Sequence, residues 1–192
     1  MGTTWIKAIH RGGSIASTLK SRINYATDPE KTEGGELVDS YECQPLTAQS
    51  EFLFSKRLYE QRTGRDQGKN DVIAYQMRMS FKPGEVTAEK ALELGNELAM
   101  RWTKGRHQFI IAAHTNTYNP HVHIIYNSVN LNCIGKFQDF KRSAIALRKV
   151  SDRFAWSMVC PSLRTRGCPK VTTARSILVK ASRRQCAASF GI

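Results

Sequence analysis

The sequence has no cysteine pair at metal-ligand or redox spacing and no long apolar run. Its five cysteines are scattered without a C-x-x-C motif, a pattern that favours reduced thiols over a disulfide framework. A membrane span needs roughly 18 to 20 consecutive apolar residues, and no stretch of this chain approaches that. The first residues also lack the hydrophobic segment of a secretory signal. We therefore expect a cytoplasmic protein without membrane insertion.

Carboxylates are also scarce, and none occurs after Asp152. The chain has 29 Lys and Arg against 16 Asp and Glu, a net charge of +13. Eight of the basic residues lie in the segment 153–192, which has no acidic residue. Such a balance indicates a polyanionic partner, most often nucleic acid, although a charged surface can also serve solubility alone.

Apolar periodicity predicts an α+β domain with a central, mostly antiparallel β-sheet flanked by helices. Alternation of apolar and polar residues predicts strands at 3–10, 72–81, 107–114 and 121–130. Apolar residues at helical spacing predict helices at 15–26, 48–64, 86–105 and 139–154. The polar, turn-rich segment 27–40 is expected to be a loop.

Three of the five histidines fall within the stretch HTNTYNPHVHIIYNSVN, residues 114–130. In a strand, His121 and His123 point to the same face because they are two residues apart. An antiparallel hairpin would place His114 beside them. Three imidazoles on one sheet face can bind a divalent metal and leave positions open for substrate. The alternative is ordinary strand histidines satisfied by hydrogen bonds or water, which is how we interpret His10 and His107.

This stretch resembles the H-x6-H-x-H metal motif of the relaxase/mobilisation nuclease family, which belongs to the histidine–hydrophobic–histidine endonucleases. Three more segments agree in order: INYATDPEKTEGG resembles the family's tyrosine motif, SFKPGE its middle motif, and GKFQDF the segment after the histidines. The resemblance covers residues 1 to about 153. It implies a relaxase-type nuclease fold and a site- and strand-specific DNA endonuclease.

The resemblance implies that the enzyme nicks and religates one strand at the transfer origin of a plasmid or conjugative element. It maps the catalytic tyrosine onto Tyr25 and the metal ligands onto His114, His121 and His123. The chemistry suits these residues, because a divalent ion polarises an otherwise poor phosphodiester electrophile. A tyrosine attacking phosphorus forms a 5′-phosphotyrosyl link that permits later religation. We expect Mg²⁺ or Mn²⁺, with Zn²⁺ as an alternative.

Further positions have supporting or electrostatic roles in this interpretation. Asn116 could hydrogen-bond to a ligand imidazole, Glu85 could cap the next helix or approach the site, and Asn127 is a third supporting position. DNA phosphates could be contacted by Lys31, Lys82, Lys136, Lys141 and Arg142, each of which could equally be a solvated surface charge.

The implied partners are single-stranded DNA at the transfer origin, an accessory mobilisation protein and the coupling protein of a secretion system. The implied location is the bacterial cytoplasm, with transfer to the recipient cell alongside the DNA. Two alternatives stay open. One is a related tyrosine replication initiator or transposase, in which the tyrosine usually follows the histidines. The other is a non-catalytic, single-stranded DNA-binding remnant of a relaxase.

The chemistry of the chain changes after residue 153, so we expect a nuclease domain over 1–153 and an aberrant basic tail over 154–192. The tail matches neither the family nor an amphipathic pattern. It is either a divergent DNA-binding extension or the product of a frameshift near Phe154. A neighbouring reading frame can encode a CLEHGLS-like run similar to what relaxases carry there, which favours poor packing beyond about residue 155.

Overall fold

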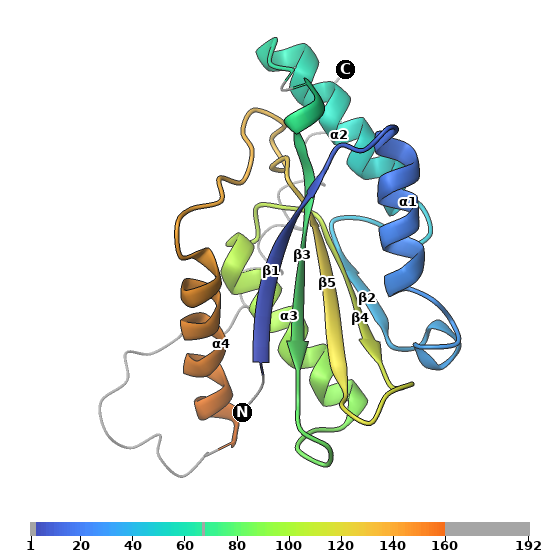
Figure 1. Ribbon diagram of the computed structural model, residues 1–192, viewed down its shortest axis with the longest axis vertical. Coiled ribbons are helices and arrows are strands. Elements are labelled where there is room, and N and C mark those ends of the chain that lie inside the picture. Colours follow the sequence, from blue (N-terminus) through green and yellow to red (C-terminus); the bar gives the residue numbers. More distant parts are fainter. Residues whose placement is uncertain (1–2, 67, 160–192) are drawn as a thin grey trace, which may run out of the picture. The chain divides into compact units, whose positions relative to one another are not determined.

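The computed structural model describes residues 3–66 and 68–159 (Figure 1). Its elements are β1 (Thr3–His10), α1 (Ile15–Ala26), η1 (Glu33–Gly35), β2 (Val38–Tyr41), α2 (Ala48–Thr63), η2 (Gly68–Asn70), β3 (Val72–Ser80), α3 (Ala88–Thr103), β4 (Phe109–His114), β5 (His121–Asn127) and α4 (Ser143–Val159). Helix α4 crosses the boundary expected after residue 153, and residues 160–192 of the expected tail lie outside the described residues.

The five strands form one sheet in the order β1-β3-β5-β4-β2, and every neighbouring pair is antiparallel. The predicted α+β class and the β4–β5 hairpin are therefore confirmed. The prediction of a loop over 27–40 is wrong at its end, where β2 pairs with β4 through Val38 opposite Ala112. This strand lies at the sheet edge, pairs with one neighbour and is only four residues long. So short a strand shows too little alternation of apolar and polar residues to be recognised in the sequence.

One face of the sheet packs on α3, which passes behind the strands in Figure 1. Met77 and Met79 of β3 lie in this core with Leu94 and Leu98 of α3, as the alternation and the helical stripe predict. Gly95 brings the helix very close to the sheet, because an added Cβ would lie 2.7 Å from a methyl carbon of Val122.

The opposite face is covered in part by α1 and α2. Leu19 and Ile23 of α1 and Phe52 of α2 pack against Ile110 of β4 and Ile125 of β5. This second core anchors α1 along the sheet and directs its C-terminal end towards the start of β5. No helix in the described part of the chain has the length and apolar character needed to cross a bilayer.

Candidate metal centre

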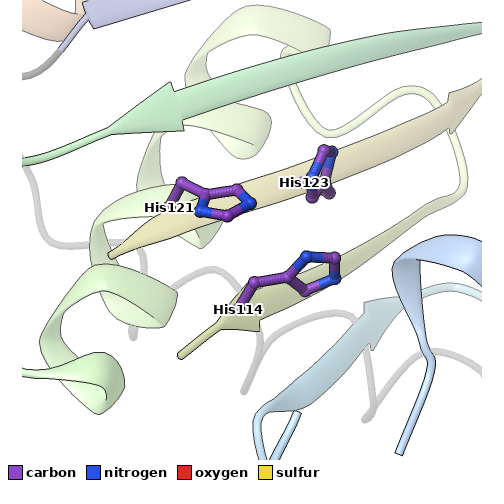
Figure 2. A group of neighbouring side chains, drawn as sticks. All are labelled: His114, His121 and His123. Atoms are coloured by element: carbon purple, nitrogen blue, oxygen red, sulfur yellow. The ribbon is translucent and has the colours of Figure 1, made fainter. Parts of the chain in front are cut away.

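The three histidines of the hairpin lie close together in Figure 2. They alternate in step with Ile110 and Ile125, so they lie on the sheet face that packs against α1. His114, the last residue of β4, pairs directly with His121, the first of β5, and His123 follows on the same side of the strand. The ring centroids are 4.6 to 5.1 Å apart. One nitrogen from each ring lies within 4.8 Å of the other two, and all three side chains are buried. A single cation can therefore contact all three.

Each imidazole is oriented through its other nitrogen. Nε2 of His114 lies 2.8 Å from the carbonyl oxygen of Ala26, the last residue of α1. Nδ1 of His121 lies 3.1 Å from the carbonyl oxygen of Asn119 and 3.2 Å from Oγ1 of Thr117. Such bonds fix the ring plane and the tautomer of a metal ligand.

His123 gives the clearest indication that the site needs a ligand. Its Nδ1 lies 3.0 Å from the side-chain amide of Gln76, but its Nε2 is buried without a hydrogen-bond partner in the described part of the chain. The amide nitrogen of Gln76 is the atom that faces Nδ1; with the amide rotated by 180°, its oxygen accepts from Nδ1–H and Nε2 keeps its lone pair for a metal. A buried polar atom without a partner is costly, and a cation supplies that partner.

Burial also sets the protonation of the site. Desolvation lowers the pKa of His114 and of His121, and it lowers the pKa of His123 to about 3, with the other two histidines adding to that shift. The rings are therefore neutral at pH 7, as metal ligation requires. The residues present fit a divalent cation, as the sequence predicted.

Tyr25 approaches this cluster from α1. Its ring centroid lies 5.9 Å from that of His114 and 5.7 Å from that of His123, and 53% of its side chain is exposed. Nζ of Lys31 lies 4.2 Å from the tyrosine ring centroid and forms a 2.7 Å ion pair with Asp28. The Tyr25 side chain, which carries a hydroxyl group and is accessible to solvent, therefore lies beside the three imidazole rings, with a lysine over its own ring.

The three predicted supporting residues lie apart from the triad's hydrogen bonds. Asn116 is exposed in the β4–β5 loop, where Thr117 rather than Asn116 reaches His121. Glu85 accepts from the backbone N–H of Lys82 at 2.9 Å and closes the turn before α3. Asn127 lies at the far end of β5, where its amide donates to Gln108 and accepts from the Val129 N–H.

The predicted phosphate-binding residues divide into two groups. Lys31 lies at the site, while Lys82, Lys141 and Arg142 are exposed elsewhere. Lys136 is a correction: its side chain is only 4% exposed and forms a buried ion pair with Asp71. Because that carboxylate is also completely buried, Lys136 is not available to DNA.

Sequence reasoning missed the contributions of β3. The alternation over 72–81 places Gln76 and Arg78 on the polar face of a strand, and β3 pairs with β5 so that Arg78 lies opposite His123. The alternation in VIAYQMRMSF was a usable signal for which side chains avoid the core. The pairing of β3 with β5 rather than with β4 could not be read from the chain alone.

Comparisons with known proteins agree with this geometry. A family model described as relaxase, MobA/VirD2-like, nuclease domain, matches residues 25–156. Protein rlx of Staphylococcus aureus is 35% identical over 131 residues, covering 68% of this chain and 37% of that protein. The group II intron-interrupted relaxase LtrB of Lactococcus lactis is 29% identical over 142 residues, covering 64% of this chain and 25% of that protein. This chain therefore spans well under half the length of these relatives.

A solved structure has the same fold. It was reported under the heading "Molecular Basis of Vancomycin Resistance Transfer in Staphylococcus aureus", and it superposes with a TM-score of 0.54 over 90% of this chain and 100% of that one. The sequence identity is 14%, so this likeness concerns the fold alone.

Proposed function

This chain belongs to the relaxase family of MobA/VirD2-like nucleases, and from that premise we propose that it nicks and religates one DNA strand at a transfer origin. Tyr25 is the proposed nucleophile, and His114, His121 and His123 are the proposed metal ligands. The observation that carries the proposal is the approach of the Tyr25 ring to within 6 Å of two histidine rings encoded about ninety residues later.

The proposed reaction is a transesterification. The Tyr25 oxygen forms a bond to phosphorus, the P–O3′ bond breaks, and the 3′ oxygen leaves as a hydroxyl after taking up a proton. A divalent ion, Mg²⁺ or Mn²⁺ with Zn²⁺ as the alternative, would supply Lewis-acid polarisation of the scissile phosphate. The half-exposed Tyr25 can release its hydroxyl proton to water. The number of phosphate ester bonds is unchanged, so the 3′ hydroxyl can reverse the step.

Two features of this chain support the tyrosine. The helix α1 is capped at Thr27, whose N–H donates to the carbonyl oxygen of Ile23 at 2.8 Å, so Tyr25 lies in an ordered last turn. Lys31 stands over the ring and provides positive charge where a phenolate and then a phosphodiester would form.

The test is a single-stranded oligonucleotide carrying the element's transfer origin, incubated with the protein and Mg²⁺ or Mn²⁺. We expect a covalent protein–DNA band that disappears with EDTA and in Tyr25→Phe. Tyr118→Phe is the matched control, because Tyr118 is 86% exposed in the β4–β5 loop beside the site. An adduct that survives Tyr25→Phe contradicts the tyrosine assignment. Binding without an adduct in the unaltered chain favours the non-catalytic remnant.

A tyrosine replication initiator or transposase is the competing enzyme class. In this chain Tyr25 precedes the histidines, and the family match begins at that residue. A duplex-cleaving activity that does not depend on a transfer-origin sequence would favour the competitor.

The cellular setting is proposed on the same basis. It comprises a bacterial cytoplasm, an accessory mobilisation protein, a coupling protein and transfer with the DNA. The nuclease domain is proposed to end near residue 153, with a frameshift near Phe154 giving the basic tail. Sequencing the gene tests this, since an immediate stop codon in the neighbouring frame would remove the frameshift.

A further inference from the structure

The part of the sheet between the metal centre and the β1 edge carries a row of three side chains. Trp5 of β1 lies opposite Arg78 of β3, which lies opposite His123 of β5. Directly paired residues project to the same face, so all three lie on the face that holds the triad. Neighbouring strands are about 4.8 Å apart, which places the Trp5 backbone roughly 10 Å from that of His123. The row therefore leads from the metal centre to the edge of the sheet.

The side chain of Arg78 has no acidic partner in the described part of the chain. Its Nε donates to Oγ of Ser80 at 3.1 Å. Lys31, a second cation near the triad, is engaged in an ion pair with Asp28. Arg78 pairs directly with His123 across β3 and β5 and projects to the same face, so it lies close enough to act on a group held at the triad.

The triad itself contributes no negative charge. Its potential ligands are three imidazoles without a carboxylate. Arg78 and a divalent ion would together leave an excess of positive charge that only an incoming anion can balance. The free Nη1 and Nη2 groups of a guanidinium match two oxygens of a phosphate.

Trp5 has the properties of a stacking platform. Its side chain is half-buried on an edge strand, and within residues 3–66 and 68–159 its indole packs against no other aromatic ring. Trp102, by contrast, donates to the hydroxyl of Tyr126 and packs against Phe137 on the other face. Lys7, two residues along β1 on the same side, is exposed and adds positive charge.

We propose that the row from Arg78 to Trp5 holds the single-stranded DNA next to the reacting phosphate. Arg78 binds a neighbouring backbone phosphate, and Trp5 stacks on a base one step further along. The strand has to be single, because the base faces of a duplex are already stacked on one another. The identity of the anion as DNA rests on the proposed function; the site for a phosphate and an adjacent planar base does not.

The experiment measures tryptophan fluorescence and affinity for unlabelled oligothymidine with the full chain in a Tyr25→Phe background. We expect strong quenching that is lost in Trp5→Phe and kept in Trp102→Phe. Arg78→Gln should weaken binding roughly ten-fold. It should also reduce the slope of log affinity against log salt by about 0.7, the value for one phosphate contact on a single strand. Arg148→Gln is the matched control, since Arg148 is 71% exposed on α4.

A second measurement needs no substitution in the row. An oligonucleotide with 5-iododeoxyuridine is photocrosslinked to the same protein, and the tryptic peptide that contains Trp5 should carry the crosslink. A crosslink confined to other peptides overturns the proposal, as does quenching that persists in Trp5→Phe. Competition by duplex DNA equal to that by single strands also overturns it.

The two proposals can fail separately. An adduct formed by the unaltered chain, together with unchanged binding in Trp5→Phe and Arg78→Gln, would contradict the row and leave the nuclease intact. Binding that depends on Trp5 and Arg78, without any adduct, would support the row and contradict the nicking reaction. The absence of any binding to single-stranded DNA would overturn the row.

Discussion

Two buried polar clusters lie in this fold, and they differ in how their members are satisfied. In the first, the Asp71 carboxylate forms ion pairs with Lys56 and Lys136, whose side chains are each 4% exposed, and Lys56 also reaches Glu60 at 2.8 Å. In the second, three neutral imidazoles face one another and Nε2 of His123 has no partner in the described part of the chain.

We call the first cluster closed, because its charged groups form ion pairs with one another, and the second open, because Nε2 of His123 has no partner among the residues that the structure describes. Asp71 forms ion pairs with Lys56 of α2 and with Lys136, which follows β5, so its negative charge is neutralised within the protein. The histidines are held by the backbone and by Gln76, and one nitrogen from each ring lies within 4.8 Å of the other two. Buried polar groups normally find partners within the protein, so a cluster that lacks one is where an external ligand belongs.

The largest expected effect comes from breaking the closed cluster. Asp71→Ala removes the carboxylate that two buried ammonium groups share, of which Lys56 keeps Glu60, and it should lower the free energy of unfolding by about 3–5 kcal/mol. Urea denaturation measures it. The matched control is Asp66→Ala, because Asp66 is 62% exposed and has a 3.7 Å pair with Arg11 and a 2.9 Å hydrogen bond from the Gly68 N–H, so its cost should stay at about 1 kcal/mol. Equal losses in both variants would mean that the Asp71 cluster is not a structural centre.

Breaking the open cluster should change ligand binding more than folding. His123→Ala leaves no buried charged group without a partner. We expect it to abolish the stabilisation that Mn²⁺ gives the unaltered protein. That stabilisation is about 2.7 kcal/mol when the metal stands at a hundred times its Kd. Thermal denaturation with and without Mn²⁺ measures it. His10→Ala, which alters an exposed histidine, should keep the full effect. A metal-dependent shift that persists in His123→Ala would rule out this residue as a ligand.

A smaller effect is expected from the residue that orients His123. Gln76→Leu removes the hydrogen bond to Nδ1 and should weaken Mn²⁺ binding by roughly ten- to a hundred-fold, the usual cost of losing such support. Calorimetric titration measures it. Gln108→Leu is the control, because Gln108 pairs with Asn127 and Ser55 away from the triad. Unchanged affinity in Gln76→Leu would show that the hairpin alone orients the ring.

The last prediction concerns how the stability of the fold depends on pH, which differs between the two clusters. Burial lowers the pKa of each triad histidine in the folded protein, so below about pH 6.5 the unfolded chain binds more protons and the metal-free fold loses stability. For Asp71, burial opposes ionisation, but hydrogen bonds from Lys136 and Lys56 outweigh it and hold the pKa below 3.8, so its contribution is lost only below about pH 4. Thermal midpoints of the metal-free protein should thus begin to fall near pH 6.5, and less so in His121→Gln. A flat profile down to pH 4 would contradict buried neutral histidines.

Strand alternation and hairpin length were sufficient to place the triad. His121 and His123 share a face because the side-chain period of a strand is two, and six loop residues returned the chain beside His114. Both rules depend only on residues that are close in the sequence, so they hold in the folded protein as well. The approach of Tyr25 came from the motif resemblance, since nothing within α1 itself indicates which strand its last turn meets.

Contacts between distant segments could not be predicted. Lys136 resembles any other surface lysine in the sequence, and only the fold brings Asp71 against it. Arg78 and Trp5 lie on recognisable strands, yet their place beside the metal centre depends on the order β1-β3-β5. Strand order is fixed by the total packing of both sheet faces, which no single segment encodes.

The hydrogen bond from His114 to the Ala26 carbonyl has a consequence for motion. It ties His114, a proposed metal ligand, to the residue next to Tyr25, so the last turn of α1 can fray only if that ring also turns. Holding His114 in place should then slow the opening of this turn. We expect amide hydrogen exchange around Tyr25 to become slower when Mn²⁺ binds, while exchange at the start of α1 stays the same. Through this one hydrogen bond, metal binding would restrict the motion of Tyr25, the proposed nucleophile.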